Sequence, residues 1–161
     1  MVCECILLGD TGSGETAQDL VAESIVELIE RRDTDIQFVM IVGDNIYENG
    51  CESVQDSQFD DKFKKPYGHV AFDNLPFFLA LGNHDYGQAD KKVGGGSDQE
   101  DTVSDNSKYQ VDYTTARENL TLPSGKKKWN MPAKWYTKSF GPCDFFIIDT
   151  NMDRLTETEI K

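Results

Sequence analysis

The sequence predicts an α/β fold in which parallel βαβ units are followed by an antiparallel hairpin. Three nearly continuous apolar runs, at residues 2–8, 36–42 and 76–81, each end in glycine followed by aspartate or asparagine. Such runs are typical of strands that are covered on both faces, as in parallel sheets. The segment between the first two runs has a helical pattern instead, and strand–helix–strand is the order of a βαβ unit.

The stretch from residue 16 to residue 32 has the spacing of an amphipathic helix. Its larger apolar residues recur at helical intervals and are Leu20, Val21, Ile25, Leu28 and Ile29. Glutamates fall on the opposite face, and Arg31 and Arg32 end the stretch, where the helix dipole favours positive charge. We therefore expect one helix whose apolar stripe packs on the sheet.

The remainder of the chain is predicted to hold a short helix, a long loop and a hairpin. A helical portion within residues 59–70 is ended by a proline and a glycine. Residues 87–108 are rich in Gly, Ser and Asp, so we expect an excursion loop with no packed structure. Residues 135–140 and 144–149 flank a Gly-Pro turn, which favours a hairpin that completes one central sheet.

Length and composition indicate one domain over residues 1–161, because 38% of the residues are hydrophobic and can form a core. Asp and Glu outnumber Lys and Arg by 29 to 16, and the net charge of −13 disfavours nucleic acid as a partner. The short basic run Lys126–Lys128 is expected in a solvated loop. We expect neither a membrane span nor a signal peptide, since no apolar segment reaches about 18 residues and no basic stretch precedes the apolar start. The compartment stays open.

The four cysteines match no spacing of a zinc site. Cys3 and Cys5 alternate along the first predicted strand and would face the same side of it. Cys51 falls in a loop and Cys143 just before a late strand, so the sequence leaves any disulfide open.

The glycine-rich stretch after the first strand allows several interpretations. As a P-loop it fails, because Glu15 stands where a lysine should meet the phosphates. As a dinucleotide fingerprint, Gly12-x-Gly14-x-x-Ala17 follows a strand and opens a helix, which favours a Rossmann-like nucleotide-binding module. As a metal site, Asp10 supplies a hard oxygen ligand at the strand end. Taken alone, the stretch also fits a glycine turn capped by Asp10.

The ends of the other two strands favour the metal site. Asp44 and Tyr47 follow the second run, and Asn83-His84-Asp85 follows the third, so three strand ends point at one place. Close carboxylates repel each other unless cations lie between them. A dinucleotide site would leave Tyr47 and the third cluster unused, whereas two metal ions about 3.5–4 Å apart that share a bridging carboxylate would use them all.

Together these motifs resemble the signature blocks of the calcineurin-like metallophosphoesterases. The blocks are Gly9-Asp10-x-Gly12, Gly43-Asp44-x-x-Tyr47 and Gly82-Asn83-His84-Asp85, in this order along the chain. The tyrosine in the second block is similar to that of purple acid phosphatases, and residues 129–136 and 146–150 resemble their small, animal-type, tartrate-resistant branch. The resemblance implies a four-layer α/β/β/α sandwich, of which this chain would form the first half.

The resemblance also implies a dinuclear metal centre and a role for each residue. Asp10 would bind Fe(III), Asp44 would bridge both ions, and Tyr47 would bind the iron as a phenolate. Asn83 would bind the second, divalent ion, which is Fe, Zn or Mn. His84 would be catalytic, positioning the phosphate or protonating the leaving alcohol, and Asp85 would either orient His84 or form the turn. The implied activity is that of an acid phosphatase that hydrolyses phosphomonoesters, small or carried by a phosphoprotein, through a metal-bound hydroxide.

Part of the family pattern is not found in the sequence. The later blocks supply three histidines, whereas this chain has only His69 and His84, and His69 is expected to be a surface or loop residue. Residues 156–161 begin like a helix, so we expect a C-terminally incomplete catalytic domain that is weakly active or inactive alone. Two alternatives stay open: the Rossmann-like module, and a degenerate phosphoesterase that acts as an interaction domain. The oligomeric state is open as well.

Overall fold

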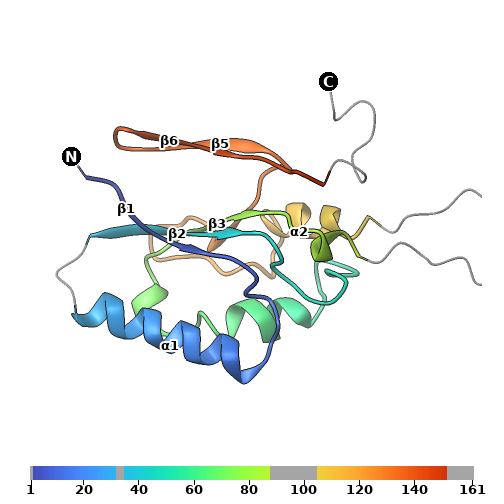
Figure 1. Cartoon of the computed structure of the whole chain (residues 1–161), viewed down its shortest axis with the longest axis horizontal. Coiled ribbons are helices and arrows are strands. Elements are labelled where there is room, and N and C mark those ends of the chain that lie inside the picture. The colour runs from blue at the N-terminus through green and yellow to red at the C-terminus, as the bar shows by residue number, and fades with distance from the viewer. Residues whose placement is uncertain (1, 32–34, 88–104, 152–161) are drawn as a thin grey trace, which may run out of the picture.

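The computed structural model describes residues 2–31, 35–87 and 105–151, and these form three layers (Figure 1). Helix α1 (Thr16–Arg31) lies on one face of a four-stranded sheet, and an antiparallel hairpin lies on the other face. The described residues thus supply three of the four layers that the sequence predicted. None of the described helices is both long and apolar enough to cross a membrane.

The first sheet is parallel throughout and has the order β1-β2-β3-β4. Its strands are β1 (Glu4–Leu8), β2 (Ile36–Val42), β3 (Phe77–Ala80) and β4 (Trp129–Asn130). The predictions for the first three strands are confirmed within two residues at each end. Strand β4 was not predicted, because a strand of two residues carries no periodicity.

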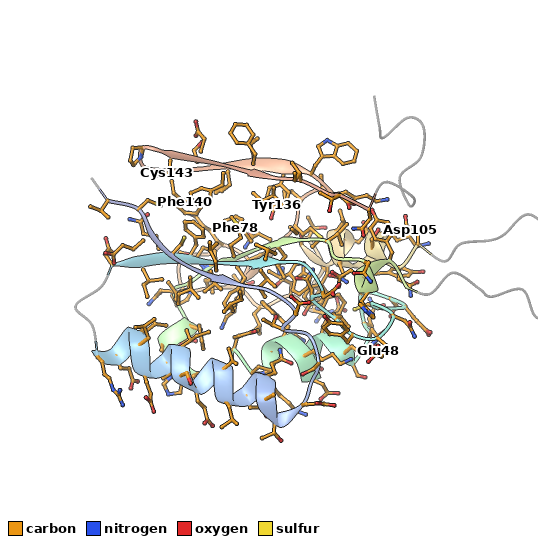
Figure 2. All side chains as sticks on the ribbon, in the orientation of Figure 1. Glu48, Phe78, Asp105, Tyr136, Phe140 and Cys143 are labelled. Atoms are coloured by element: carbon orange, nitrogen blue, oxygen red, sulfur yellow. The ribbon has the colours of Figure 1, made fainter. Side chains whose placement is uncertain are left out.

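The hairpin consists of β5 (Tyr136–Phe140) and β6 (Cys143–Ile147) and forms a sheet of its own. The prediction of one central sheet that includes these strands is therefore wrong. Strand β4 pairs with β3 at the position that the hairpin would have taken. Instead, one face of the hairpin packs on the first sheet, and Phe140 lies over Phe78 of β3 (Figure 2). The ring of Phe140 also stacks on that of Phe38, with 4.0 Å between the ring centroids.

Alternation along β1 separates two cores. Ile6 and Leu8 pack into the larger core, on the side of α1, with buried residues such as Val39 and Leu79. Cys3 and Cys5 pack on the opposite side, in the smaller core under the hairpin. The continuous apolar runs predicted strands that are covered on both faces. Strands β1, β2 and β3 each place residues in both cores, although Leu7 and Val42 remain 62% and 58% exposed.

Helix α1 has the predicted extent, but its packed face differs from the prediction. Ala22 and Ile25 are buried, whereas Leu20 remains 57% exposed and Val21 46%. Gln18 is also buried, because its side-chain amide accepts a hydrogen bond from Gly14 N and donates one to Lys62 O. The packed face of α1 therefore includes Ile25 and Ile29 of the predicted stripe, together with the polar side chain of Gln18.

The remaining short elements follow the second strand. The predicted helix within residues 59–70 is divided into a π-helical turn, η1 (Asp60–Lys64), and a 3-10 turn, η2 (Val70–Phe72). A further helix, α2 (Ser107–Tyr113), was not predicted. Its start overlaps the predicted loop 87–108, of which residues 88–104 lie outside the described part of the chain. The predicted helical start at 156–161 lies outside it too.

The expectation that the basic run Lys126–Lys128 lies in a solvated loop is wrong for Lys128. Its side chain is only 3% exposed, and Nζ donates a hydrogen bond to Tyr67 O at 2.6 Å. Burial lowers the pKa of Lys128 below its ordinary value of 10.5, although the charge of Asp73 opposes the shift. A buried ammonium whose hydrogen-bond partner among the described residues is a carbonyl oxygen contributes little to stability, because its desolvation offsets the hydrogen bond.

We expect Lys128→Met to leave the unfolding free energy at pH 7 within about 1 kcal/mol of the parent value. In the folded parent the Lys128 ammonium loses its proton at a lower pH than it does in the unfolded chain. The parent's stability relative to the variant should therefore rise as pH increases toward 10.5. Urea unfolding at pH 7 and pH 10 measures both effects. Lys126→Met, at an exposed position, should show neither, and a loss of several kcal/mol in Lys128→Met would contradict this account.

Candidate metal centre

Two aspartates stand at the carboxyl ends of adjacent parallel strands. Asp10 follows β1 and Asp44 follows β2, and both have positive φ angles, 56° and 52°. Aspartate adopts this left-handed conformation more readily than most residues, but the conformation still costs free energy. Such strain is concentrated at functional sites, where the surrounding structure maintains it.

Backbone hydrogen bonds join the two loops that carry these aspartates. Asp10 N donates to Gly43 O at 3.1 Å, Gly12 N donates to Asp44 O at 3.2 Å, and Tyr47 N donates to Gly12 O at 2.9 Å. The loops approach so closely that only glycine fits at position 12, where a Cβ would lie 2.0 Å from Asn45 O. The positions of Asp10, Asp44 and Tyr47 are therefore fixed by the backbone.

Three side-chain oxygens converge at this junction. Tyr47 Oη lies 2.9 Å from Asp10 Oδ1 and 2.8 Å from Asp44 Oδ2. Burial raises the pKa of the Tyr47 phenol above its ordinary value, and the hydrogen bonds to Asp44 and Asp10 raise it further. A single phenolic proton cannot serve two carboxylates fully. A hard cation prefers such oxygen donors and would neutralise their charge, so the donor set fits a metal ion.

The third predicted cluster lies beside these oxygens, in the 3-10 turn η3 (His84–Tyr86) and the residue before it. His84 N donates to the second carboxylate oxygen of Asp44, Oδ1, at 3.1 Å. The His84 ring lies 4.5 Å from the Tyr47 ring between centroids. Asn83 is exposed, and its side chain makes no hydrogen bond within the described chain, so its amide oxygen is available as a ligand.

The imidazole of His84 is oriented by Glu48, which the sequence reasoning did not identify. The Nδ1 atom lies 2.7 Å from Glu48 O, and since a carbonyl can only accept, Nδ1 carries the proton. The Glu48 carboxylate lies 3.8 Å from the same atom. These contacts leave Nε2 as the ring atom that can exchange a proton.

One of the two sequence interpretations had Asp85 orient His84 through a hydrogen bond. In the structure Asp85 accepts hydrogen bonds from other residues instead. It is fully buried, and its oxygens accept hydrogen bonds from the backbone N–H groups of Asn45, Ile46 and Gly82. The pKa of Asp85 is raised to about 6, because the effect of burial exceeds the opposing effect of these hydrogen bonds and one from Gln110. Asp85 therefore joins the second and third loops, which agrees with the turn-forming interpretation, and it acts on the site through the backbone.

Two further residues complete this buried network. The side chain of Gln110, on α2, donates to Asp85 Oδ1 at 2.8 Å and accepts from Asn45 Nδ2 at 3.2 Å. Asn45 Nδ2 also donates to Ala80 O at 2.7 Å, at the end of β3. Asn45 could have been suspected from its place after Asp44, but no sequence signal marked Gln110.

His69 takes no part in the site. It is exposed at the start of η2, where its Nδ1 accepts a hydrogen bond from Ala71 N at 3.2 Å, as expected for a loop residue. Among the residues that the structure describes, no three His, Cys, Asp or Glu side chains are grouped so as to hold a metal ion. A metal site formed by the described residues would therefore need the phenol oxygen of Tyr47 as well as the carboxylates of Asp10 and Asp44.

A sequence profile of one family matches most of the chain. The profile is that of the calcineurin-like phosphoesterases, and it matches residues 5–151. The chain belongs to the calcineurin-like phosphoesterase family. Membership decides against the Rossmann-like alternative, and the topology agrees. In the described sheet β1 is an edge strand, whereas a dinucleotide site lies where the strand order reverses beside the first strand.

Relatives of this chain include purple acid phosphatases. It is 39% identical to purple acid phosphatase 3 of Arabidopsis thaliana over 82 residues, which are 50% of this chain and 22% of the relative. It is 25% identical to tartrate-resistant acid phosphatase type 5 of Mus musculus over 126 residues, 78% of this chain and 30% of the relative. The chain thus spans less than a third of the length of these relatives.

Two solved structures share the fold of this chain. The purple acid phosphatase PPD1 of yellow lupin seeds superposes with a TM-score of 0.53 at 18% identity, covering 98% of this chain and 26% of that one. GAP50, the anchor in the inner membrane complex of Plasmodium, superposes with a TM-score of 0.58 at 20% identity, covering 89% of this chain and 39% of that one. At these identities the likeness establishes the fold alone.

Proposed function

We propose that this phosphoesterase chain carries part of a dinuclear metal centre of the acid phosphatase type, which hydrolyses phosphomonoesters. The strongest support is that Asp10 Oδ1 and Asp44 Oδ2 both lie within 2.9 Å of Tyr47 Oη. The ions would be Fe(III) and a divalent Fe, Zn or Mn. Because the chain spans 22% to 30% of the relatives compared above, the activity of whole relatives is part of the proposal.

In this proposal Asp10 and Tyr47 would hold the trivalent ion, Asn83 would hold the divalent ion, and Asp44 would contribute to holding both. When bound, the two ions would neutralise charge on the phosphoryl oxygens and activate the attacking water. His84 would position the phosphate or give a proton to the leaving alcohol from Nε2, since Nδ1 is fixed on Glu48 O. An open pocket of about 310 Å³, lined in part by Tyr47, Glu48 and Lys62, adjoins the site and would receive the rest of the substrate.

We expect Asp44→Asn to weaken binding of iron by about 10–100-fold, because a bridging charge is lost. Asparagine tolerates the positive φ at this position, so the backbone should stay in place. Titration with Fe(III), followed by visible absorption, measures the affinity. The phenolate band should disappear in Tyr47→Phe. Asp35→Asn, exposed ahead of β2, is the matched control. Equal iron affinity in Asp44→Asn and the parent would overturn the proposed centre.

One observation favours a second candidate, a phosphoesterase fold that serves as an interaction domain. Within the described residues the only carboxylate pair of the site is Asp10 and Asp44, with no third His, Cys, Asp or Glu grouped beside them. Hydrolysis of an aryl phosphate by the 161-residue chain, abolished in Asp44→Asn, would support the hydrolase. No iron binding and no turnover would support the interaction domain.

A further inference from the structure

Three thiols lie together at the end of the molecule remote from the candidate metal centre. Cys3 stands just ahead of β1, Cys5 lies within it, and Cys143 is the first residue of β6. Figure 2 shows Cys143 at the turn of the hairpin, on the side of the molecule where β1 begins in Figure 1. Cys3 and Cys5 pack against the same core under the hairpin as Phe140 and Phe145, the neighbours of Cys143.

Cys5 pairs with Phe38 between β1 and β2, the ring of Phe38 stacks on that of Phe140 at 4.0 Å, and Phe140 pairs with Cys143 in the hairpin. Cys143 therefore lies over the side of the sheet that carries Cys3 and Cys5, and it acts on the Cys3 thiol through its charge and a side-chain hydrogen bond. Cys5 interacts with Cys143 electrostatically, without a hydrogen bond. All three are free and partly exposed, so an oxidant in solution can reach them and their side chains have room to rotate. The thiols do not form a three-ligand metal site, since the described residues contain no such group.

We propose that Cys3 and Cys143 form a disulfide that fastens the start of β1 to the hairpin. Oxidised glutathione is a sufficient oxidant. One cysteine thiolate attacks a glutathione sulfur and releases one glutathione thiolate. The other cysteine thiolate then attacks the mixed disulfide and releases the second. Two cysteine protons pass to the two released thiolates, and the two electrons that the cysteine pair loses reduce the glutathione disulfide.

A bond between Cys3 and Cys143 would join the hairpin covalently to the start of the first sheet. The hairpin shares no strand pairing with the first sheet and is held to it by the small aromatic core around Phe38 and Phe78. A Cys3–Cys143 bond would close a loop of about 140 residues, and closure of long loops removes much entropy from the unfolded chain. We expect the oxidised form to melt about 5–15 °C above the reduced form.

The pKa of Cys3 is raised by burial and by the neighbouring Cys143. Because only the thiolate attacks a disulfide, a raised pKa leaves less reactive thiolate at neutral pH. Oxidation by glutathione should therefore be slow at pH 7 and faster at pH 8.5. This pH dependence follows from the thiol pair alone and does not require the metal centre.

The test is oxidation of the 161-residue chain with oxidised glutathione at pH 8.5, followed by intact mass and by a tryptic digest without reductant. We expect a loss of two hydrogen atoms, a cross-linked peptide that contains Cys143, and the higher melting temperature, all reversed by dithiothreitol. No lysine or arginine lies between Cys3 and Cys5, so trypsin leaves both in one peptide and variants must distinguish them.

The cross-link and the rise in melting temperature should persist in Cys5→Ser and in Cys51→Ser, and both should be lost in Cys3→Ser and in Cys143→Ser. Replacement of partly exposed Cys3 should leave the reduced protein folded, which circular dichroism checks. Glutathione adducts without a cross-link, a cross-link that survives Cys3→Ser, or a Cys3–Cys143 bond with an unchanged melting temperature would each overturn the proposal.

Discussion

Replacement of Asp85 by alanine should lower the free energy of unfolding by about 3–5 kcal/mol, the largest loss of stability that we expect from a single side chain. The carboxylate is fully buried and accepts three backbone hydrogen bonds, from Asn45 at 2.9 Å, Ile46 at 3.0 Å and Gly82 at 2.8 Å. Alanine would leave these N–H groups buried without a partner. Since they belong to the loops of Asp44 and Asn83, the candidate metal centre should loosen with them.

Urea unfolding monitored by circular dichroism measures this loss. Asp85→Asn, which keeps one acceptor oxygen but places an NH2 group against donors, should lose about 2–4 kcal/mol. Asp35→Ala, at an exposed position, should change stability by less than about 0.5 kcal/mol. If Asp85→Ala unfolded at the same urea concentration as Asp35→Ala, the network would not hold the loops as described.

The first three strands of the first sheet were predictable because each lies in a continuous apolar run of four or more residues that ends in glycine. Strand β4 was not predictable, because two residues show no period. The separate position of the hairpin depends on β4 as well, since that strand occupies the edge of β3. The sequence of a hairpin specifies that its two strands pair, but not which face of the molecule they cover.

Much of the candidate centre was also predictable, but the structure that supports it was not. Asp10, Asp44 and Tyr47 follow strand ends in short motifs, and the structure brings their oxygens together. The role of Asp85 depends on Gln110, which reaches it from a helix 25 residues further along the chain. This contact depends on how α2 packs against the loops, and no local sequence pattern indicates that packing.

Gly12→Ala should cost about 3 kcal/mol or more of stability and weaken iron binding at the same time. A Cβ at position 12 would lie 2.0 Å from Asn45 O and 2.5 Å from Ile46 N. Both are backbone atoms of the loop that Asp85 holds, so no side-chain rotation can relieve the clash. The loops of Asp10 and Asp44 would have to separate, and the hydrogen bond from Tyr47 N to Gly12 O at 2.9 Å would lengthen or break.

Gly9→Ala is the matched control, because position 9 lies in the same loop, directly before Asp10. Its Cβ would meet only Val42 Cγ2, at 3.2 Å, a side-chain atom that can shift by a few tenths of an ångström. Urea unfolding and iron titration of both variants separate the two effects. We expect Gly9→Ala to stay within about 1 kcal/mol of the parent and to keep its iron affinity. Equal losses in both variants would mean that the loop tolerates no added methyl group anywhere. Equal retention would mean that the close approach at Gly12 does not position the aspartates.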